Sequence, residues 1–427
     1  MKFLPFILYM LSLTGCQSQT TDKEHMVVEI DSLINVKSYF KASAHFDLNK
    51  KELDDFTALR FEATLANVFN QLEKSNQLIK VLFEKYKDSL SKTEERDLLN
   101  TQLSNAVKLF DYKQADKITN TLISNYGDVT SPDELKSTKN NGSIWKAVIN
   151  YPKQSVQFKG DSFIRLNRDK AGLKNLNVVH NSKNYPFIFD TGANLSTIIE
   201  SQAKSMGIDI IDIEVSVNTI TGKRVNSKVG VAKHFTIEHM DFNNVIFLVF
   251  PDEALYIPQI DYQINGILGY PVISAMKELH FLEEDNIYIP LESTLDKERN
   301  LAIEYLTPLI NLQMKGGDEM VFTFDTGADA TMLYKSYFDS RKEEVLRSYT
   351  KTKIRFGGAG GNTEIEGYDV VFEPVVNHKI IVMDSVSLIP ELIKNSDRHS
   401  YGNIGQDFIS KFDKMVLNFE KMFIHFE

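Results

Sequence analysis

The chain has 427 residues, a single cysteine and a formal net charge of −10 at pH 7. At roughly 150 residues per domain, this length corresponds to two or three domains, each with its own core. The acidic balance argues against a nucleic-acid partner, which calls for a basic face. The single cysteine, Cys16, excludes a disulfide bond within one molecule.

The first 16 residues predict export and lipid attachment. Met1 and Lys2 precede an apolar stretch at residues 3–11, which is shorter than the roughly 20 residues that cross a bilayer. Residues 13–16, Leu-Thr-Gly-Cys, resemble a bacterial lipobox, whose cysteine is lipidated after cleavage. We therefore expect residues 1–15 to be a signal peptide and Cys16 to anchor the exported protein to a bacterial membrane, on its periplasmic or cell-surface face. The alternative for Cys16 is a buried free thiol.

Residues 16–130 are predicted to form a helical region. Between Gln17 and Tyr126 the chain contains neither Gly nor Pro. Apolar residues follow helical spacing in three places: Phe61, Leu65, Val68 and Leu72; Leu99, Leu103, Ala106 and Phe110; Ala115, Ile118 and Leu122. The last two patterns can form a helical hairpin. The segment that begins at Asp111 resembles part of a tetratricopeptide hairpin, and an unrelated helical bundle is the alternative.

A β-rich region is predicted to follow a linker. Residues 131–150 are interpreted as that linker, because Ser-Pro-Asp at 131–133 and Lys-Asn-Asn-Gly at 139–142 are typical of turns. Short segments rich in Val, Ile and Phe then appear, such as 245–250, 321–324 and 423–426, which predict strands.

The β-rich region contains one unit twice. Residues 188–193, Ile-Phe-Asp-Thr-Gly-Ala, recur as Thr-Phe-Asp-Thr-Gly-Ala at 323–328, so that Asp190 and Asp325 are 135 positions apart. Ile-Leu-Gly at 267–269 and Asn-Ile-Gly at 403–405 end 79 and 80 residues after the respective Asp. A single Asp-Thr-Gly is a weak signal, because it arises by chance in roughly one such chain in twenty and its Asp can merely cap a turn, but duplication in register removes most of that risk. We predict two similar lobes, residues 151–295 and 296–427.

These motifs resemble those of the aspartic proteases, and in particular a single-chain, two-lobed retropepsin-like enzyme. The resemblance implies an all-α helical region followed by an all-β bilobal acid-protease fold, with Asp190 and Asp325 as the catalytic pair. It implies that Thr191, Gly192, Thr326 and Gly327 support the two loops, with the threonines bonded across the lobe interface. It places hairpin flaps at Thr221, Gly222, Gly357, Gly358, Gly360 and Gly361, for which a flexible loop is the alternative at 357–361. It also implies that residues 267–269 and 403–405 thread beside the Asp loops.

Paired carboxyl groups suit peptide hydrolysis. One group can take a proton from water while the other protonates the carbonyl oxygen or leaving nitrogen. We therefore expect an aspartic endopeptidase that cleaves extended segments of peptides or unfolded proteins, with no metal or cofactor. Ala193 and Ala328 offer no hydroxyl to the carboxylates, so we expect a pH optimum less acid than that of digestive relatives.

Two departures from the family pattern leave other functions open. Asn194 follows the first Asp-Thr-Gly-Ala where Asp329 follows the second, and Asn403 stands where an aliphatic residue is usual. We expect neither asparagine to touch the Asp pair. The alternatives are a catalytically silent peptide-binding module of the same fold, or a scaffold whose helical region binds a protein partner.

Overall fold

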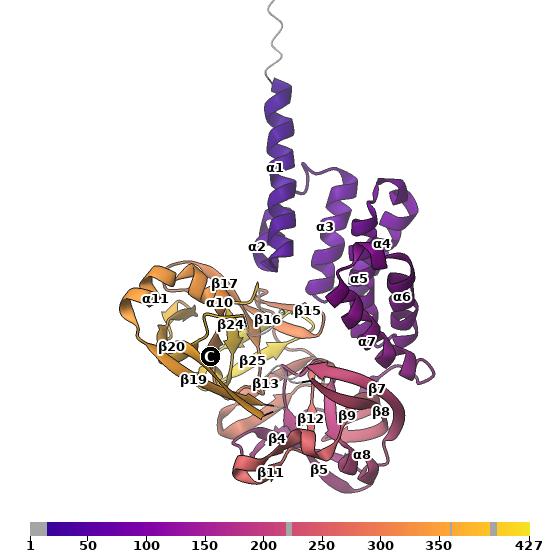
Figure 1. The fold of residues 1–427 in the computed structure, drawn as a ribbon, viewed down its shortest axis with the longest axis vertical. Helices are drawn as coiled ribbons and strands as arrows, with labels where there is room; N and C mark the ends of the chain where they lie inside the picture. Colours follow the sequence, from indigo (N-terminus) through magenta and orange to yellow (C-terminus); the bar gives the residue numbers. More distant parts are fainter. Residues whose placement is uncertain (1–14, 219–223, 359–360, 393–398) are drawn as a thin grey trace, which may run out of the picture.

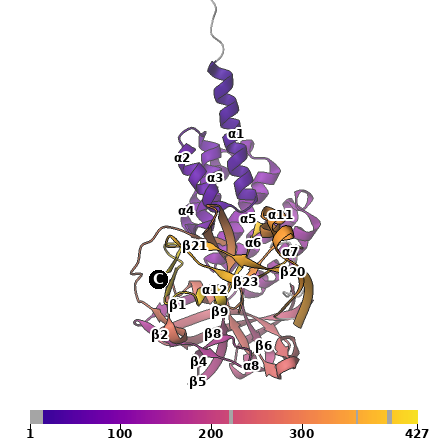
Figure 2. The ribbon, with the colours of Figure 1, turned by 90° about the vertical axis from the view of Figure 1, so that its left-hand side faces the viewer.

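The computed structural model describes residues 15–218, 224–358, 361–392 and 399–427. A helical region stacks on two β-rich lobes, which confirms the predicted fold class (Figures 1 and 2). The predicted signal peptide falls almost entirely on residues 1–14, outside the described residues. Cys16 lies near the start of α1, which projects away from the lobes (Figure 1). None of the helices within the described residues combines the length and apolar character that a membrane span requires.

The helical region consists of successive helices that pack against their chain neighbours. They are α1 (Gly15–Asn35), α2 (Tyr39–Asn49), α3 (Asp55–Val68), α4 (Leu72–Lys85), α5 (Lys92–Lys108), α6 (Tyr112–Asn125) and α7 (Pro132–Val148). The predicted apolar faces are turned inward, since Phe61, Val68, Ala115 and Ile118 are buried. Helices α5 and α6 contact each other, as the predicted hairpin requires.

The predicted linker at 131–150 is wrong, because residues 132–148 form α7. The side chain of Ser131 accepts the N–H of Glu134, the Glu134 carboxylate accepts the N–H of Ser131, and Pro132 begins the helix. Ser-Pro-Asp here is a helix start, a use of the same residues that turns also favour. Gly142 lies inside the helix, at a position where a side chain would not fit: a Cβ there would lie 2.6 Å from Thr119 Cγ2 on α6.

Lobe 1 is built on one mixed sheet with the order β1-β9-β6-β12-β5-β4-β8-β7. Its strands are β1 (Ser155–Phe158), β4 (Lys174–His180), β5 (Lys183–Phe189), β6 (Ser196–Ile199), β7 (Asp209–Asn218), β8 (Arg224–Ile237), β9 (Met240–Phe250) and β12 (Gly266–Leu268), with β3 (Asn167–Arg168) on β4. Strands β5 and β12 run parallel, with Ile188 opposite Ile267. Helices α8 (Glu200–Ser205) and α9 (Tyr270–Ser274) and the small hairpin of β10 (Tyr256–Ile257) and β11 (Tyr262–Gln263) complete the lobe.

Lobe 2 repeats this topology with the order β19-β20-β23-β18-β24-β17-β16-β21-β22. Its strands are β15 (Leu301–Glu304), β16 (Thr307–Met314), β17 (Glu319–Phe324), β18 (Met332–Leu333), β19 (Lys351–Gly358), β20 (Gly361–Phe372), β21 (Pro374–Val376), β22 (Lys379–Ile380), β23 (Met383–Leu388) and β24 (Gly402–Ile404), with helices α10 (Lys335–Ser340), α11 (Lys342–Ser348) and α12 (Gln406–Ile409). Parallel strands β17 and β24 correspond to β5 and β12, with Thr323 opposite Asn403.

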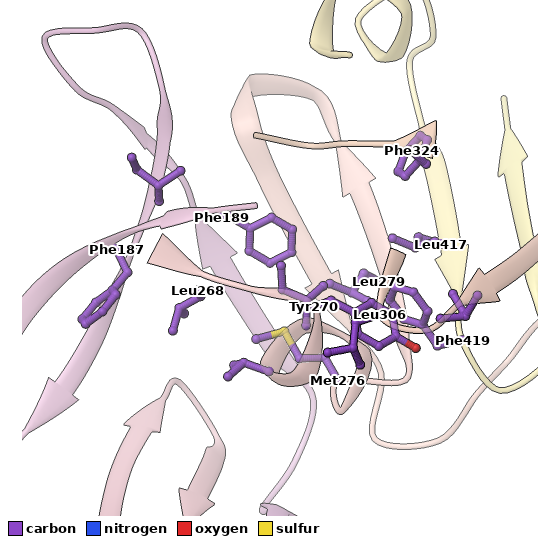
Figure 3. Packing of buried hydrophobic residues seen from close by; sticks show 14 of the residues in the cluster. Phe187, Phe189, Leu268, Tyr270, Met276, Leu279, Leu306, Phe324, Leu417 and Phe419 are labelled. Carbon is purple, nitrogen blue, oxygen red and sulfur yellow. The ribbon is translucent and has the colours of Figure 1, made fainter. Parts of the chain in front are cut away.

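A third sheet joins the lobes, with the order β2-β14-β13-β25-β26. It comprises β2 (Ser162–Arg165), β13 (Glu278–Leu282), β14 (Asn286–Ile289), β25 (Met415–Asn418) and β26 (Phe423–Phe426). Antiparallel pairing of β13 with β25 sets Leu279 of lobe 1 opposite Leu417 of lobe 2. Figure 3 shows both leucines in the buried cluster that also contains Phe189 and Phe324, the residues before the two aspartates. One continuous core therefore supports both Asp loops.

The helical region is packed against both lobes. Helix α7 contacts β7 and β8 of lobe 1, and α3 contacts β15 of lobe 2. The buried ammonium of Lys108 donates to the carbonyl oxygen of Ile303 at 3.0 Å. The carboxamide of Asn140 bonds the backbone of Ser216 twice: its Oδ1 accepts the N–H and its Nδ2 donates to the carbonyl, each at 2.9 Å. Asn140 of α7 thus makes the same pair of backbone hydrogen bonds to β7 that a residue of a neighbouring strand would make.

Replacing Asn140 by Ala should therefore loosen β7. Both hydrogen bonds to Ser216 would be lost, at about 1 kcal/mol of local stability. Amide hydrogen exchange, followed by mass spectrometry, should become roughly fivefold faster in residues 214–218. The Asn140→Asp variant keeps the acceptor and should leave the Ser216 amide protected. Unchanged exchange in the Ala variant would mean that other contacts hold the strand.

Candidate active site

The structure brings Asp190 and Asp325 together at the lobe interface. Each follows the last residue of a central strand, Phe189 of β5 or Phe324 of β17. The N–H of Asp190 donates to the carbonyl of Leu268 at 3.1 Å, and that of Asp325 to Ile404 at 3.0 Å. The segments 267–269 and 403–405 thus run beside the Asp loops, and each carboxyl group lies against the loop glycine of the other lobe.

The glycines of the two loops are required by the carboxyl group of the opposite lobe. A Cβ on Gly192 would lie 2.5 Å from Asp325 Cγ, and one on Gly327 would lie 2.5 Å from Asp190 Oδ1. Their N–H groups also bind the carboxylates: Gly192 donates to Asp190 Oδ1 and Gly327 to Asp325 Oδ1, both at 2.8 Å. The following alanine of each loop donates to the same oxygen at 3.1 Å. Glycine therefore permits the close approach of the pair and supplies a donor.

The two threonines exchange hydrogen bonds across the interface, as the family resemblance implied. The Thr191 hydroxyl donates to the carbonyl of Phe324 at 2.9 Å and accepts the N–H of Thr326 at 3.0 Å. Reciprocally, the Thr326 hydroxyl donates to the carbonyl of Phe189 at 3.2 Å and accepts the N–H of Thr191 at 3.0 Å. Both side chains are buried. The four bonds fix the separation of the two Asp loops.

Replacing Thr191 by Val should destabilise the protein by about 3 kcal/mol. Valine keeps the shape but leaves the Thr326 N–H and the Phe324 carbonyl buried without their partner, and each such group costs about 1–3 kcal/mol. The measurement is the free energy of unfolding from urea denaturation. Thr197→Val, in the neighbouring strand β6, is the matched control, since its buried hydroxyl has no hydrogen-bond partner among the described residues. Equal losses in the two variants would contradict the argument.

Two hydroxyl residues at the site were missed in the sequence. Ser196 Oγ accepts the N–H of Gly269 at 3.1 Å, and Thr331 Oγ1 accepts the N–H of Gly405 at 3.1 Å. Each stands six residues after its Asp, so the 135-residue repeat itself could have identified them. These bonds hold the segments 267–269 and 403–405 beside the Asp loops.

The expectation that neither asparagine touches the Asp pair is wrong for Asn403. Its Nδ2 donates to Asp325 Oδ2 at 3.2 Å, and its Oδ1 accepts the Thr323 hydroxyl at 2.6 Å. The side chain of Asn194 instead accepts the hydroxyl of Thr307 at 3.1 Å. Position 403 is next to Asp325 because β24 pairs with β17, a contact that a linear motif does not reveal.

The electrostatics of the pair favour retention of a proton. Burial and the neighbouring Asp325 carboxylate raise the pKa of Asp190 well above its ordinary value, and the N–H groups of Gly192 and Ala193 oppose the rise only partly. Two adjacent carboxylates cannot both ionise readily, so the pair holds one proton where isolated aspartates would hold none. A group that donates a proton and one that accepts a proton then lie side by side.

The predicted flaps fall partly outside the described residues. Gly357 and Gly358 end β19 and Gly361 begins β20, with Gly358 opposite Gly361 in the hairpin. Gly360 is outside the described residues, as are Thr221 and Gly222, which connect β7 to β8. Each lobe therefore presents a hairpin at the predicted position. Their action as flaps stays a prediction.

Comparison with known proteins agrees with this geometry. Residues 176–272 match the family model described as aspartyl protease, a range that includes Asp190 and the segment 267–269. No curated protein matches the chain. Among the described residues, no group of three or more His, Cys, Asp or Glu side chains could hold a metal ion. Residues 176–272 of lobe 1 are therefore similar to aspartyl proteases, and the geometry of the Asp loop in this range recurs in lobe 2.

Proposed function

We propose that the protein is an aspartic endopeptidase that hydrolyses peptide bonds with water activated between Asp190 and Asp325. The observation that supports this most strongly is the facing carboxyl pair, in which each carboxyl group lies against the loop glycine of the other lobe. Burial and like charge also raise the pKa of Asp190. Each carboxyl group receives two backbone N–H groups and comes from a different lobe. An Asp that only caps its own turn would not need a second carboxyl group from the other lobe beside it.

The reaction would proceed by two proton transfers. The ionised carboxylate takes a proton from water, whose oxygen attacks the peptide carbonyl carbon, while the protonated carboxyl group gives its proton to the carbonyl oxygen. The resulting gem-diol then breaks its C–N bond: the first group returns the water proton to the nitrogen, and a diol hydroxyl reprotonates the second. The products are an amine and a carboxylic acid, and the pair regains its starting state.

We propose that the substrate is an extended segment of a peptide or unfolded protein. Added as a strand beside the hairpins β7–β8 and β19–β20, it would satisfy its main-chain donors and acceptors whatever its sequence. Glycines at the end of β19 and the start of β20 are the residue type that permits close approach of another backbone, because they carry no side chain.

Cleavage of an unfolded protein by purified chain from residue 17 onward tests this function. The wild type should cleave, pepstatin should inhibit it, and Asp190→Asn and Asp325→Asn should be inactive. Peptide binding without turnover in the wild type would instead indicate a silent peptide-binding module. Capture of a folded partner, with neither turnover nor peptide binding, would indicate a scaffold.

We also propose that the mature protein is exported and held at a bacterial membrane by lipid on Cys16. The lipobox-like residues 13–16 support this proposal. A Cys16→Ser chain should leave the membrane fraction, and its retention there would contradict lipid anchoring.

A further inference from the structure

The two halves of the site differ at the paired strand positions beside the aspartates. In lobe 1, Ile188 of β5 is opposite Ile267 of β12; in lobe 2, Thr323 of β17 is opposite Asn403 of β24. Ile188 and Thr323 occupy the same position of the repeat, two residues before the aspartate. Lobe 2 therefore has a hydroxyl and an amide where lobe 1 has two aliphatic side chains.

This difference gives Asp325 a donor that Asp190 does not receive from the equivalent place. Asp325 Oδ1 accepts the N–H groups of Gly327 and Ala328, and its Oδ2 accepts Asn403 Nδ2. Asp190 Oδ1 accepts the matching backbone pair, but Ile267 has no hydrogen to donate to its Oδ2. The two carboxyl groups therefore accept the same backbone hydrogen bonds, but only Asp325 also accepts one from a side chain at this position.

Thr323 fixes which way the Asn403 amide points. The distance of 2.6 Å between Thr323 Oγ1 and Asn403 Oδ1 is that of an O–H···O hydrogen bond and is short for an amide N–H donor. With its oxygen bound to that hydroxyl, the amide must direct its N–H toward Asp325. An amide N–H stabilises an ionised carboxylate more than a carboxylic acid, because the oxygens of the neutral acid are weaker acceptors.

We propose that Asn403 is a positioning residue that keeps Asp325 ionised as the base and leaves the shared proton on Asp190 as the acid. The inference rests on the proposed function. It assigns the two steps: Asp325 takes the water proton and later gives it to the leaving nitrogen, while Asp190 protonates the carbonyl oxygen and regains a proton from the diol. Ala193 and Ala328 provide no hydroxyl to the carboxyl groups, which is why we expect a less acid pH optimum. Asn403 supplies a side-chain donor of that kind to Asp325 alone.

Three other aspartates, Asp190, Asp407 and Asp329, face or flank the Asp325 loop. Asp190 faces Asp325 directly across the interface. Asp407 of α12 is engaged elsewhere, since its Oδ1 accepts the N–H and hydroxyl of Thr331. Asp329 lies in the loop that follows Asp325, and its carbonyl accepts the N–H of Asp407.

The pH dependence of kcat/KM tests the proposal, with Asn403→Leu compared against Ile267→Leu at the matched position. Asn403→Leu loses a hydrogen bond to a charged group, so the acid limb of its kcat/KM profile should move to higher pH by about one unit. At a pH below that limb, kcat/KM should therefore be roughly tenfold lower than in the wild type. The basic limb, where Asp190 loses its proton, should move much less. Ile267→Leu should leave the acid limb unmoved, and Thr323→Val, which frees the amide, should shift it in the same direction as Asn403→Leu.

A second variant and a second measurement can disprove the role of Asn403 without disproving the proposed protease function. Asn403→Asp has nearly the same shape and places a like charge at Asp325 Oδ2, so its acid limb should rise further. Carboxyl ¹³C NMR of Asp-labelled, full-length protein requires no turnover, and the Asp190→Asn and Asp325→Asn spectra identify the two signals. Near neutral pH the Asp190 carboxyl should be protonated and the Asp325 carboxylate ionised. Unmoved limbs in an active Asn403→Leu enzyme, or a proton on Asp325, would overturn the inference and leave the proposed function intact.

Discussion

Asp190→Asn is expected to lower kcat/KM by at least about 10³-fold and, at neutral pH, to make the folded protein more stable. General acid–base groups contribute about 10²–10⁴-fold each, and the variant removes the partner that holds the shared proton. The pKa of Asp190 is raised by burial and by Asp325, so the folded state binds this proton more tightly than the unfolded chain does. The stability so gained is present at acid pH and is lost as the pH rises through the raised pKa. Asparagine is uncharged and avoids that loss.

Activity and stability are to be measured on the same preparations. Wild type and Asp190→Asn should have diverging midpoints of thermal unfolding as the pH rises, with the variant higher. The Thr197→Val protein, altered outside the pair, should follow the wild-type pH dependence. An inactive Asp190→Asn protein that is equally destabilised at every pH would point to damaged folding, and the lost activity would then say nothing of catalysis.

Glu278→Gln is expected to destabilise the protein by about 3 kcal/mol at neutral pH. Glu278 lies on β13 in the sheet between the lobes and is 1% exposed. Burial alone would raise its pKa, but hydrogen bonds from His280, Ser293 and Thr294 outweigh burial and lower the pKa to about 2. Asn418 of lobe 2 adds a donor at 2.6 Å. A fall from 4.5 to about 2 corresponds to about 3 kcal/mol in favour of the ionised form.

The pH dependence follows from the direction of this shift. A lowered pKa contributes stability that is complete above the unfolded value near 4.5 and is lost as the pH falls through about 2. The gap in unfolding free energy between wild type and Glu278→Gln should therefore be widest at neutral pH and narrow between pH 4.5 and 2. Glu319→Gln, at an exposed strand position, should change stability by less than about 0.5 kcal/mol. A gap that is constant with pH would show that Glu278 acts through its shape alone.

The sequence predicted the site better where two halves could be compared. Asp190, Asp325 and their threonines and glycines were found because a repeat of 135 residues marks them twice. Glu278 is not marked by the repeat. Its donors include residues 293–294 and Asn418 of lobe 2, and the pairing of β13 with β25 is what places Asn418 opposite Glu278.

The errors have the same origin. Ser131, Pro132 and Gly142 were interpreted as turn residues, yet the first two begin α7 and the third is small because Thr119 of α6 lies against it. Asn403 was placed away from the Asp pair, although strand pairing aims its amide at Asp325. Local preferences of Ser, Pro, Gly and Asn are shared by several structures, and tertiary contacts select among them.

Fusion of the two halves into one chain also has a consequence for how such a site can diverge. In an enzyme made of two identical subunits, any substitution beside one catalytic carboxyl group appears beside the other as well. An amide at the position of Asn403 would then favour ionisation on both sides and work against the retained proton. With Ile267 in one half and Asn403 in the other, the single chain can change one carboxyl group while sparing its twin. A repeat within one chain therefore allows the two aspartates to acquire different neighbours.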